Sequence, residues 1–369
     1  MRILSPVLYT FLVALLLCSH MAYAEQLVPE DKNAAVILAY HRVGEDAYPE
    51  TNIRVEQFRS HITELTEGAY NILPLPQILA AQKNDEPLPH HSVAITFDGG
   101  HKSVIENAVP LLLEAGIPFT IFVAADQISS ETNRHIDWSS LRKLAKNELV
   151  TIGLHPAGYT RLYNEPEEEI RRQINNALVI SRKELGQAPK LFAYPFGETS
   201  ATYINIVKEL GFNAAFGQHS GVSAGTTNPY NIPRFSMTES FGDMERFRMI
   251  VNALPIHASD IEPADPLLSS PRPDIGFTLS ESLQDQADRL SCFISDSEKP
   301  TIEQIGSRRV ELRLQEKMQA ERIRVNCTMS VPKDEKFEET RWRWLGMLLV
   351  HPKIGQQVTN INYVDTGAE

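Results

Sequence analysis

Between residues 36 and 216, short runs of apolar and β-branched residues alternate with longer stretches in which apolar residues recur every three or four positions. The short runs are typical of buried parallel strands, and the longer stretches are typical of amphipathic crossover helices. The pattern predicts strands over 36–40, 92–97, 119–123, 150–153, 191–194 and 214–216. It predicts helices over 55–66, 104–114, 139–146, 165–185 and 201–210. Gly116, Gly186 and Gly211 follow three of these helices, where a left-handed cap residue is expected. So many strand–helix units favour an α/β barrel over an open sheet.

The pattern changes in the last third of the chain. Residues 254–274 are rich in proline, serine and aspartate, which is typical of a linker. Beyond them the apolar residues recur at every second position, as in Ile323, Val325 and Cys327, which predicts a small all-β sandwich. We therefore divide the chain into a leader at 1–24, a barrel at 25–253, a linker at 254–274, a sandwich at 275–352 and a polar tail at 353–369.

The first residues resemble a secretory signal peptide. Arg2 is followed by an apolar run over 7–18 and then by small residues that end at Ala24. The run is too short for a permanent membrane span, so we expect export to the periplasm or beyond without a stable membrane span. In such an oxidising compartment, Cys292 and Cys327 are expected to form a disulfide, with two separately buried thiols as the alternative.

The net charge of the chain bears on whether it binds nucleic acid. The formal net charge is -12, from 35 basic and 47 acidic residues. Nucleic acid is not an expected partner, because its phosphates are bound by basic surfaces.

Polar residues stand just past the predicted strands. They are His41, Asp98, His155, Glu198 after the Tyr194-Pro195-Phe196-Gly197 turn, and Gln218 with His219. Because the carboxyl ends of parallel strands meet on one face of a barrel, we expect these groups to converge there.

Three segments at these strand ends resemble one family. They are Thr96-Phe97-Asp98-Gly99-Gly100, Ile152-Gly153-Leu154-His155-Pro156 and Phe192-Ala193-Tyr194-Pro195-Phe196-Gly197. In this order they are similar to the NodB-homology polysaccharide deacetylases, as are Tyr40-His41-Arg42-Val43 and Ile232-Pro233-Arg234-Phe235. The resemblance covers about residues 36–250. It implies a distorted (β/α) barrel and a metal-assisted hydrolysis of N-acetyl groups on polysaccharide.

The family's catalytic groups carry over only in part. Asp98 matches the general base, and His155 matches the first of two metal-binding histidines. Gly99 stands where the family has a metal-binding aspartate, and Tyr159 stands where it has the second histidine. Glycine offers no ligand and a phenol is a poor zinc ligand at neutral pH, so a divalent, zinc-like cofactor is in doubt. Phe196 matches the residue whose backbone N–H holds the oxyanion.

Other residues complete the predicted site. His101 and Tyr159 are the alternative metal ligands, and His219 is assigned with Asp98 and Phe196 to the catalytic group. The predicted substrate-binding residues are His41, Tyr194, Pro195, Glu198 and Trp138.

These observations favour a hydrolase that removes acetyl groups from N- or O-acetylated cell-surface polysaccharide. One alternative is a non-catalytic polysaccharide-binding relative that has lost the metal site, in which Asp98 and His155 are relics. Another is a glycosidase that uses Asp98 and Glu198 as paired carboxylates. In the sandwich, Trp342 and Trp344 either stack on sugar or belong to the core, in which case Arg341 and Arg343 form the exposed face.

Overall fold

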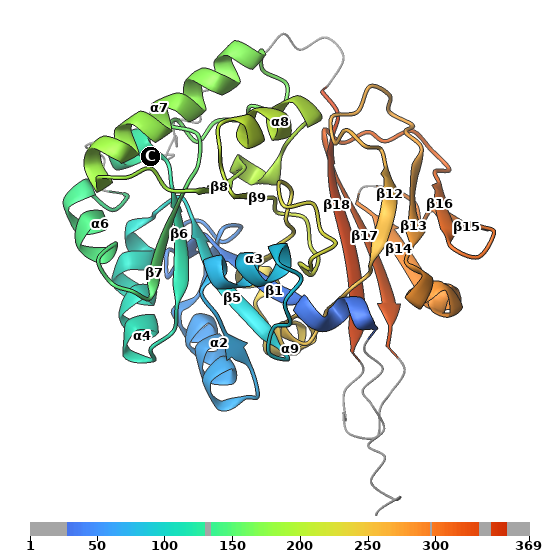
Figure 1. The fold of residues 1–369 in the computed structure, drawn as a ribbon, viewed down its shortest axis with the longest axis horizontal. Helices are drawn as coiled ribbons and strands as arrows, with labels where there is room; N and C mark the ends of the chain where they lie inside the picture. The colour runs from blue at the N-terminus through green and yellow to red at the C-terminus, as the bar shows by residue number, and fades with distance from the viewer. Residues whose placement is uncertain (1–27, 130–133, 296, 332–340, 353–369) are drawn as a thin grey trace, which may run out of the picture.

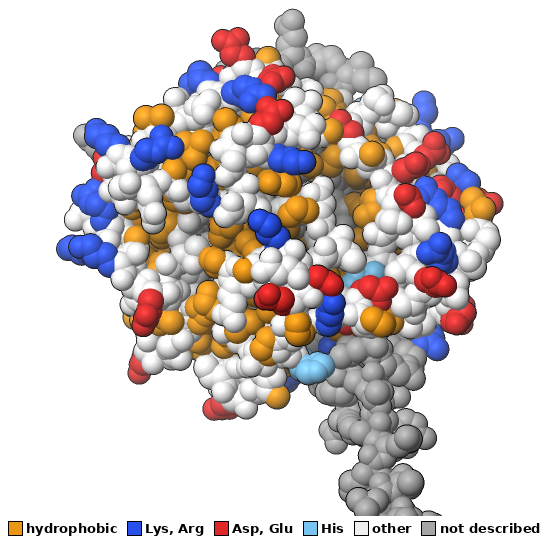
Figure 2. All heavy atoms as spheres, viewed as in Figure 1, with side chains coloured by type: hydrophobic (Ala, Val, Ile, Leu, Met, Phe, Trp, Pro, Cys, Tyr) orange, Lys and Arg blue, Asp and Glu red, His pale blue; other side chains and the backbone are white. Residues whose placement is uncertain are grey.

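The computed structural model describes residues 28–129, 134–295, 297–331 and 341–352, and it shows an α/β barrel beside an all-β sandwich (Figure 1). The leader predicted at 1–24 and the tail predicted at 353–369 lie outside the described residues. Among the described helices, none is long and apolar enough to cross a membrane. Figure 2 shows acidic and basic side chains interspersed over one face of both parts.

The barrel is built on one curled parallel sheet. Its strands follow the order β10-β1-β5-β6-β7-β8-β9, with β4 beside β5. They are β1 (Ala35–Tyr40), β4 (Asn71–Ile72), β5 (Ser92–Asp98), β6 (Phe119–Val123), β7 (Val150–Leu154), β8 (Leu191–Ala193), β9 (Ala214–Phe216) and β10 (Phe235–Ser236). A bridge between Phe216 and Ile232 spans the gap between the two edge strands. The predicted α/β barrel and its six strands are confirmed, whereas β4 and β10 are too short to give a sequence pattern.

Helices cover the outside of this sheet (Figure 1). They are α2 (Val55–Glu67), α3 (Leu75–Lys83), the π-helical turn η3 (Val104–Ala108) with α4 (Val109–Glu114), α5 (Ala125–Ile128), α6 (Trp138–Leu144), α7 (Glu167–Leu185), α8 (Ala201–Glu209) and α9 (Met244–Val251). Short 3-10 turns are η2 (Pro29–Asn33), η4 (Pro195–Gly197), η5 (Glu239–Phe241) and η6 (Glu281–Arg289), and β2 (Arg42–Val43) pairs with β3 (Asn52–Ile53). The three predicted cap glycines, Gly116, Gly186 and Gly211, all have positive φ. The five predicted helices are present, and α3, α5 and α9 were not predicted.

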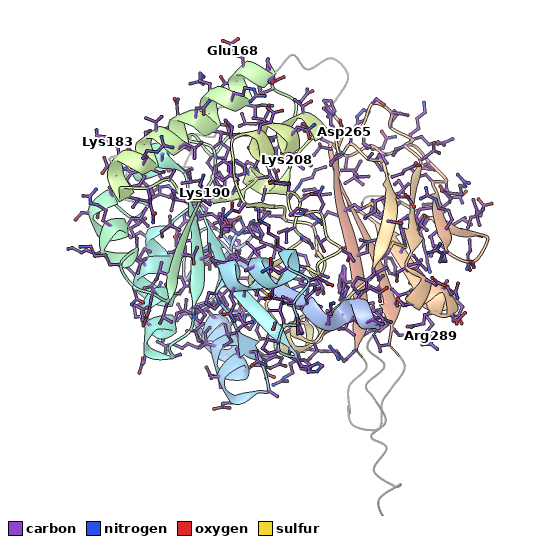
Figure 3. All side chains as sticks on the ribbon, in the orientation of Figure 1. Glu168, Lys183, Lys190, Lys208, Asp265 and Arg289 are labelled. Carbon is purple, nitrogen blue, oxygen red and sulfur yellow. A yellow bond between two sulfur atoms is a disulfide. The ribbon has the colours of Figure 1, made fainter. Side chains whose placement is uncertain are left out.

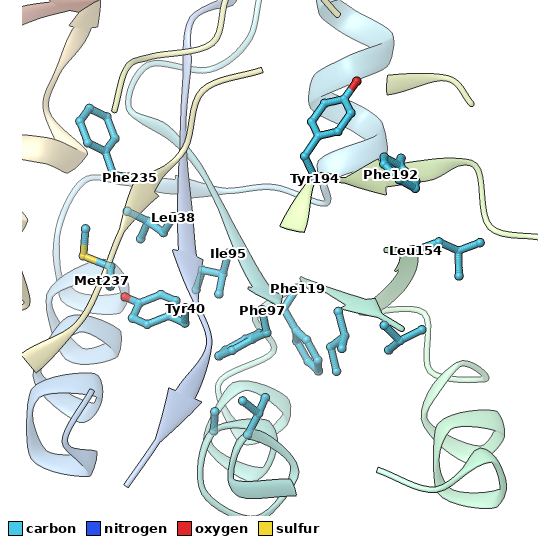
Figure 4. Close-up of a cluster of buried hydrophobic side chains, with 14 of the residues drawn as sticks. Leu38, Tyr40, Ile95, Phe97, Phe119, Leu154, Phe192, Tyr194, Phe235 and Met237 are labelled. Carbon is cyan, nitrogen blue, oxygen red and sulfur yellow. The ribbon is translucent and has the colours of Figure 1, made fainter. Parts of the chain in front are cut away.

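The layer between the curled sheet and its covering helices is apolar and aromatic. All residues of β1, β5 and β6 are buried, as expected for strands covered on both faces. Figure 4 shows part of this cluster, in which Tyr40, Phe97 and Phe119 lie close together. This packed layer fixes the strands, so the residues just past their carboxyl ends are held by a rigid frame.

The all-β part consists of two four-stranded sheets. One has the order β11-β18-β17-β14 and the other β12-β13-β16-β15. The strands are β11 (Leu254–Pro255), β12 (Ala258–Glu262), β13 (Ile275–Leu279), β14 (Leu290–Ile294), β15 (Thr301–Ile305), β16 (Arg309–Arg313), β17 (Arg322–Ser330) and β18 (Trp342–Val350). The residues predicted as a linker, 254–274, carry β11 of the first sheet and β12 of the second. We propose that the second domain begins at Leu254.

A disulfide joins neighbouring strands of the first sheet. Cys292 of β14 and Cys327 of β17 lie opposite each other and are bonded, as predicted. Both are fully buried in the apolar interior of the sandwich.

Strand β18 connects the sandwich to the barrel. The Trp344 ring packs edge-on against Phe235 of the barrel, with centroids 5.2 Å apart. Arg343 is fully buried and donates to both carboxylate oxygens of Asp31, at 2.8 and 2.7 Å. The expectation that Arg343 belongs to an exposed face is therefore wrong. Its strand is covered by the segment before β1, which the two-residue pattern does not indicate.

Candidate functional site at the barrel mouth

Asp98 and Arg234 form a buried ion pair at the carboxyl end of β5. Both side chains are fully buried. The guanidinium donates to both carboxylate oxygens, at 2.7 and 2.8 Å, and its Nε donates to the carbonyl oxygen of Gly217. Thr96 accepts a further bond from Nη1 at 3.1 Å. A buried charge pair of this kind needs all of its hydrogen bonds, and this one has a nearly complete set.

The ion pair keeps Asp98 ionised. Burial alone raises the pKa of this carboxyl group, but the charge of Arg234, together with His155 and the Arg234 hydrogen bond, holds it well below its ordinary value. Asp98 is therefore a carboxylate at neutral pH, and a weaker base than an ordinary aspartate.

His155 faces this carboxylate from the end of β7. Its Nδ1 lies 2.8 Å from the carbonyl oxygen of Ala193, so Nδ1 carries the hydrogen and donates it. The other nitrogen, Nε2, is 4.0 Å from Oδ1 of Asp98 and has no hydrogen-bond partner among the described atoms, although it is buried. Burial lowers the pKa of His155 to about 4, and Asp98 opposes that shift. The imidazole is neutral at pH 7 and presents a free acceptor to the mouth.

His41 and Gln218 complete the polar group around Asp98. The amide nitrogen of Gln218 donates to Oδ2 of Asp98 and lies 3.2 Å from Nε2 of His41. His41 itself is 3.9 Å from the same carboxylate, and burial lowers its pKa to about 4. The structure thus brings together His41, Asp98 and His155 as predicted from the strand ends.

His219 does not join this group. The segment after β9 runs alongside Ile232 and Arg234 in an extended ladder, so Gln218 and His219 point in opposite directions. Gln218 reaches Asp98, whereas the ring of His219 folds back beside Gly217, where a Cβ would lie 2.6 Å from its Nδ1. Gln218, and not His219, forms a hydrogen bond with Asp98, and a catalytic role for His219 stays a prediction.

Two of the predicted substrate-binding residues have other contacts. Tyr194 is fully buried, packs on Tyr203 and donates its hydroxyl to the carbonyl oxygen of Tyr230, so its side chain is part of the core. A role for Tyr194 in substrate binding stays a prediction. Trp138 begins α6 and donates its indole N–H to Ser129. A role for Trp138 in substrate binding stays a prediction.

The wall of the mouth beside His155 is aromatic. The Tyr159 ring meets the imidazole edge-on at 4.6 Å between centroids, and it meets the Phe196 ring at 5.5 Å. Phe196 lies in the turn Pro195–Gly197 with a φ of 58°, a left-handed conformation that is uncommon for a bulky residue. Glu198 follows this turn, is 2% exposed and lies near Arg161 and Arg322.

The residues expected to hold the family's metal do not fit one. Both oxygens of Asp98 are occupied by Arg234, and Gly99 has no side chain. Burial and the charge of Asp98 raise the pKa of Tyr159, so its phenol stays protonated and binds a cation poorly. The ring of His101, the other alternative, lies tilted against that of His135, with centroids 5.0 Å apart. Its Nε2 is 2.7 Å from where a Cβ on Gly99 would stand. Among the described residues, no group of three or more His, Cys, Asp or Glu side chains is arranged to hold a metal ion.

We expect that restoring the lost ligands gives a tighter metal site when His101 is also removed. In the variant Gly99→Asp/Tyr159→His, the imidazole of His101 has to shift to admit a Cβ at position 99, and adding His101→Ala frees that space. The φ of 90° at Gly99 strains the backbone of both variants alike. Tyr159 has a φ of 53°, which histidine tolerates better than most residues. By calorimetric titration with zinc, the triple variant should bind at least ~100-fold more tightly than the wild type, in the range of stepwise ligand effects. A triple variant that binds no better would show that these positions do not face Nε2 of His155.

A parallel barrel with a polar group at the carboxyl ends of its strands is an architecture typical of enzymes that act on small groups of a substrate held at the mouth. The sequence model of the polysaccharide deacetylase family matches residues 85–215, which include Asp98 and His155. Over these residues, the chain is similar to the polysaccharide deacetylases.

The chain is similar to several curated and solved relatives. A poly-beta-1,6-N-acetyl-D-glucosamine N-deacetylase of Staphylococcus aureus (strain NCTC 8325 / PS 47) is 24% identical over 249 residues, which cover 60% of this chain and 86% of the relative. The protein of the same name in Escherichia coli (strain K12) is 23% identical, over 57% of this chain and 37% of that protein. The structure of IcaB from Ammonifex degensii superposes with a TM-score of 0.55 at 22% identity, over 60% of this chain and 97% of that one. The Streptococcus pyogenes deacetylase PplD gives a TM-score of 0.54 at 16% identity, over 59% and 98%.

Arg234 is the site residue that sequence reasoning missed. Its segment, Ile232-Pro233-Arg234-Phe235, supported the family resemblance, but no role was assigned to it. The signal was present, because an arginine immediately before a buried strand needs a buried acceptor. Asp98 is that acceptor, 136 positions away in the chain.

Proposed function

We propose that the barrel mouth is the active site of a hydrolase that removes acetyl groups from acetylated cell-surface polysaccharide. The observation that carries the proposal is the pairing of Oδ1 of Asp98 with the unpartnered Nε2 of His155, 4.0 Å apart and both buried. Two acceptors at this separation are within reach of both hydrogens of one water molecule. The lone pairs of such a water remain free to attack a carbonyl carbon.

The proposed reaction follows from this geometry. The water oxygen attacks the acetyl carbon, and its proton passes to the acceptor pair, with Asp98 as the base. Since Arg234 weakens the basicity of Asp98, Nε2 of His155 shares the proton. The C–N bond then breaks, the proton moves to the departing nitrogen, and the products are acetate and a free amine. Phe196 is the proposed oxyanion donor through its backbone N–H.

The substrate class is inferred from the relatives. Those from Staphylococcus aureus and Escherichia coli are named for poly-beta-1,6-N-acetyl-D-glucosamine, a polymer of N-acetylated sugars. We propose a substrate of this chemistry for the present chain, reached after export through the leader at 1–24. His41 and Glu198 remain the proposed sugar-binding side chains.

We expect acetate release from oligomers of N-acetylglucosamine, both chitin-like and β-1,6-linked, by the purified mature protein. Since the described residues do not fit a metal, the rate should change by less than about twofold when a chelator is present. Acetate is quantified by an enzymatic assay, and the metal content of the same sample is measured in parallel. Release that the chelator abolishes would contradict the metal-independent site.

A second candidate is a protein that binds acetylated polysaccharide without cleaving it. The observation that favours it is that Gly99 and Tyr159 stand at two expected ligand positions, while Asp98 is held in an ion pair with Arg234. This alternative predicts that the oligomers bind and that no acetate appears. A binding measurement made beside the acetate assay separates the two functions.

A further inference from the structure

The turn Pro195–Gly197 is held in an unusual conformation. Phe196 has a left-handed backbone, and Gly197 approaches the next segment so closely that a Cβ there would lie 2.3 Å from the amide nitrogen of Gln218. The turn also carries the wall of the mouth, because Phe196 contacts Tyr159 and Tyr159 contacts His155. A displacement of this turn would therefore move the groups packed against His155.

The β-sandwich contacts the turn from outside the barrel. Arg322, the first residue of β17, donates through Nη2 to the carbonyl oxygen of Phe196. Asp265, in the segment between β12 and β13, accepts a 2.9 Å hydrogen bond from the backbone N–H of Ala201, where α8 begins. Figure 3 shows Asp265 at the junction between the sandwich and α8. The two contacts lie on either side of residues 197–200.

Between these two contacts lies a buried carboxylate. Glu198 is 2% exposed, and neither of its oxygens has a hydrogen-bond partner among the described atoms. Its Oε1 is 3.6 Å from Nε of Arg322, and its Oε2 is 3.4 Å from Nε of Arg161. Arg322 thus makes two contacts between the sandwich and the turn. One is its hydrogen bond to the backbone carbonyl of Phe196, and the other is its electrostatic attraction to the carboxylate of Glu198.

We propose that Arg322 and Asp265 are positioning residues, through which the sandwich holds the turn 195–201 and thereby sets the wall of the barrel mouth. Neither side chain has to touch the substrate. The effect on catalysis rests on the proposed function, whereas the effect on the turn does not. The barrel mouth is accordingly complete only when the sandwich is docked.

Hydrogen exchange of the full mature chain, without any substrate, tests the effect on the turn. In Arg322→Ala, the amides of Gly197 and Glu198 should exchange at least ~10-fold faster than in the wild type, since local opening is resisted by fewer contacts. Arg322→Lys keeps a donor and should recover part of the protection. Arg313→Ala is the control, because Arg313 is an exposed arginine of β16 that pairs with Glu303, and it should exchange like the wild type.

Acetate release by the same variants tests the effect on catalysis. We expect Arg322→Ala to lower kcat about tenfold with KM within about twofold, which is typical of lost positioning. Asp265→Asn should give a smaller change in the same direction. Unchanged exchange at residues 197–198 in Arg322→Ala overturns the positioning role whatever the acetate assay shows. Faster exchange at residues 197–198 in Arg322→Ala supports the positioning role. If the wild type releases no acetate in the same experiment, the proposed function is contradicted and the positioning role is not.

Discussion

Arg234→Met is expected to lower the free energy of unfolding by about 3–5 kcal/mol at pH 7. Removing one partner of a buried ion pair leaves the other charge without compensation, and this cost exceeds what the pair itself contributes. In this chain, Asp98 would lose both guanidinium hydrogen bonds, and the carbonyl oxygen of Gly217 would lose its donor. Urea unfolding of the mature protein measures the difference. Arg324→Met, on an exposed residue, is the control and should change the stability by less than about 0.5 kcal/mol.

The size of this loss should depend on pH. Because the folded-state pKa of Asp98 lies below that of the unfolded chain, its ionised form contributes stability above about pH 4. That contribution is lost as the pH falls through the lower, folded-state pKa. In Arg234→Met, burial acts on Asp98 without the opposing guanidinium, so the carboxyl group is protonated at a higher pH. The difference between wild type and variant should therefore shrink on acidification. A constant difference from pH 7 to pH 3 would show that Arg234 does not stabilise the carboxylate.

His155→Ala is expected to lower kcat for acetate release by about 10²–10⁴-fold, the range in which a positioned acid–base group contributes. The variant loses the free Nε2 acceptor and its donation to Ala193, while the ion pair between Asp98 and Arg234 remains intact. KM should change little, since the imidazole holds the attacking water and not the sugar. Initial rates on an N-acetylglucosamine oligomer measure both constants.

A matched control for this variant is His90→Ala. His90 is exposed and precedes β5, at the opposite end of that strand from Asp98, so its loss should change kcat by less than about twofold. Equal rates for the wild type and His155→Ala would remove His155 from the reaction.

The barrel was predictable because its signals are local. Buried parallel strands give short β-branched runs in the sequence, and crossover helices give amphipathic stretches. Gly186 marks the end of a helix, because glycine readily adopts the left-handed conformation found there. Asp98 and His155 could be placed at one mouth for the same reason, since strand ends follow from strand positions.

Other parts of the site depend on contacts that the local pattern does not contain. Gln218 and His219 are adjacent, and only the register of their segment against Ile232 determines which of the two faces Asp98. Arg322 reaches the mouth from a sheet whose docking has no local signal.

The sandwich shows the same limit. Its alternation predicted the strands, and export to an oxidising compartment predicted the Cys292–Cys327 pair. The proline-rich composition of 254–274 concealed β11 and β12. A two-residue period shows which side chains of a strand share a face. It does not show which other part of the chain covers that face. Arg343 is buried because Asp31 lies against it, which is a long-range contact.

The central claim is that Asp98 and His155 together hydrolyse an acetyl group at the barrel mouth. Its most direct test follows [1-13C]acetyl-labelled N-acetylglucosamine oligomer by NMR with the wild type and Asp98→Asn, each matched for folding and for metal content. We predict that free labelled acetate accumulates with the wild type and falls at least ~100-fold with Asp98→Asn. Equal, background-level acetate from the two proteins would contradict the claim and leave the mouth as a site that only binds sugar.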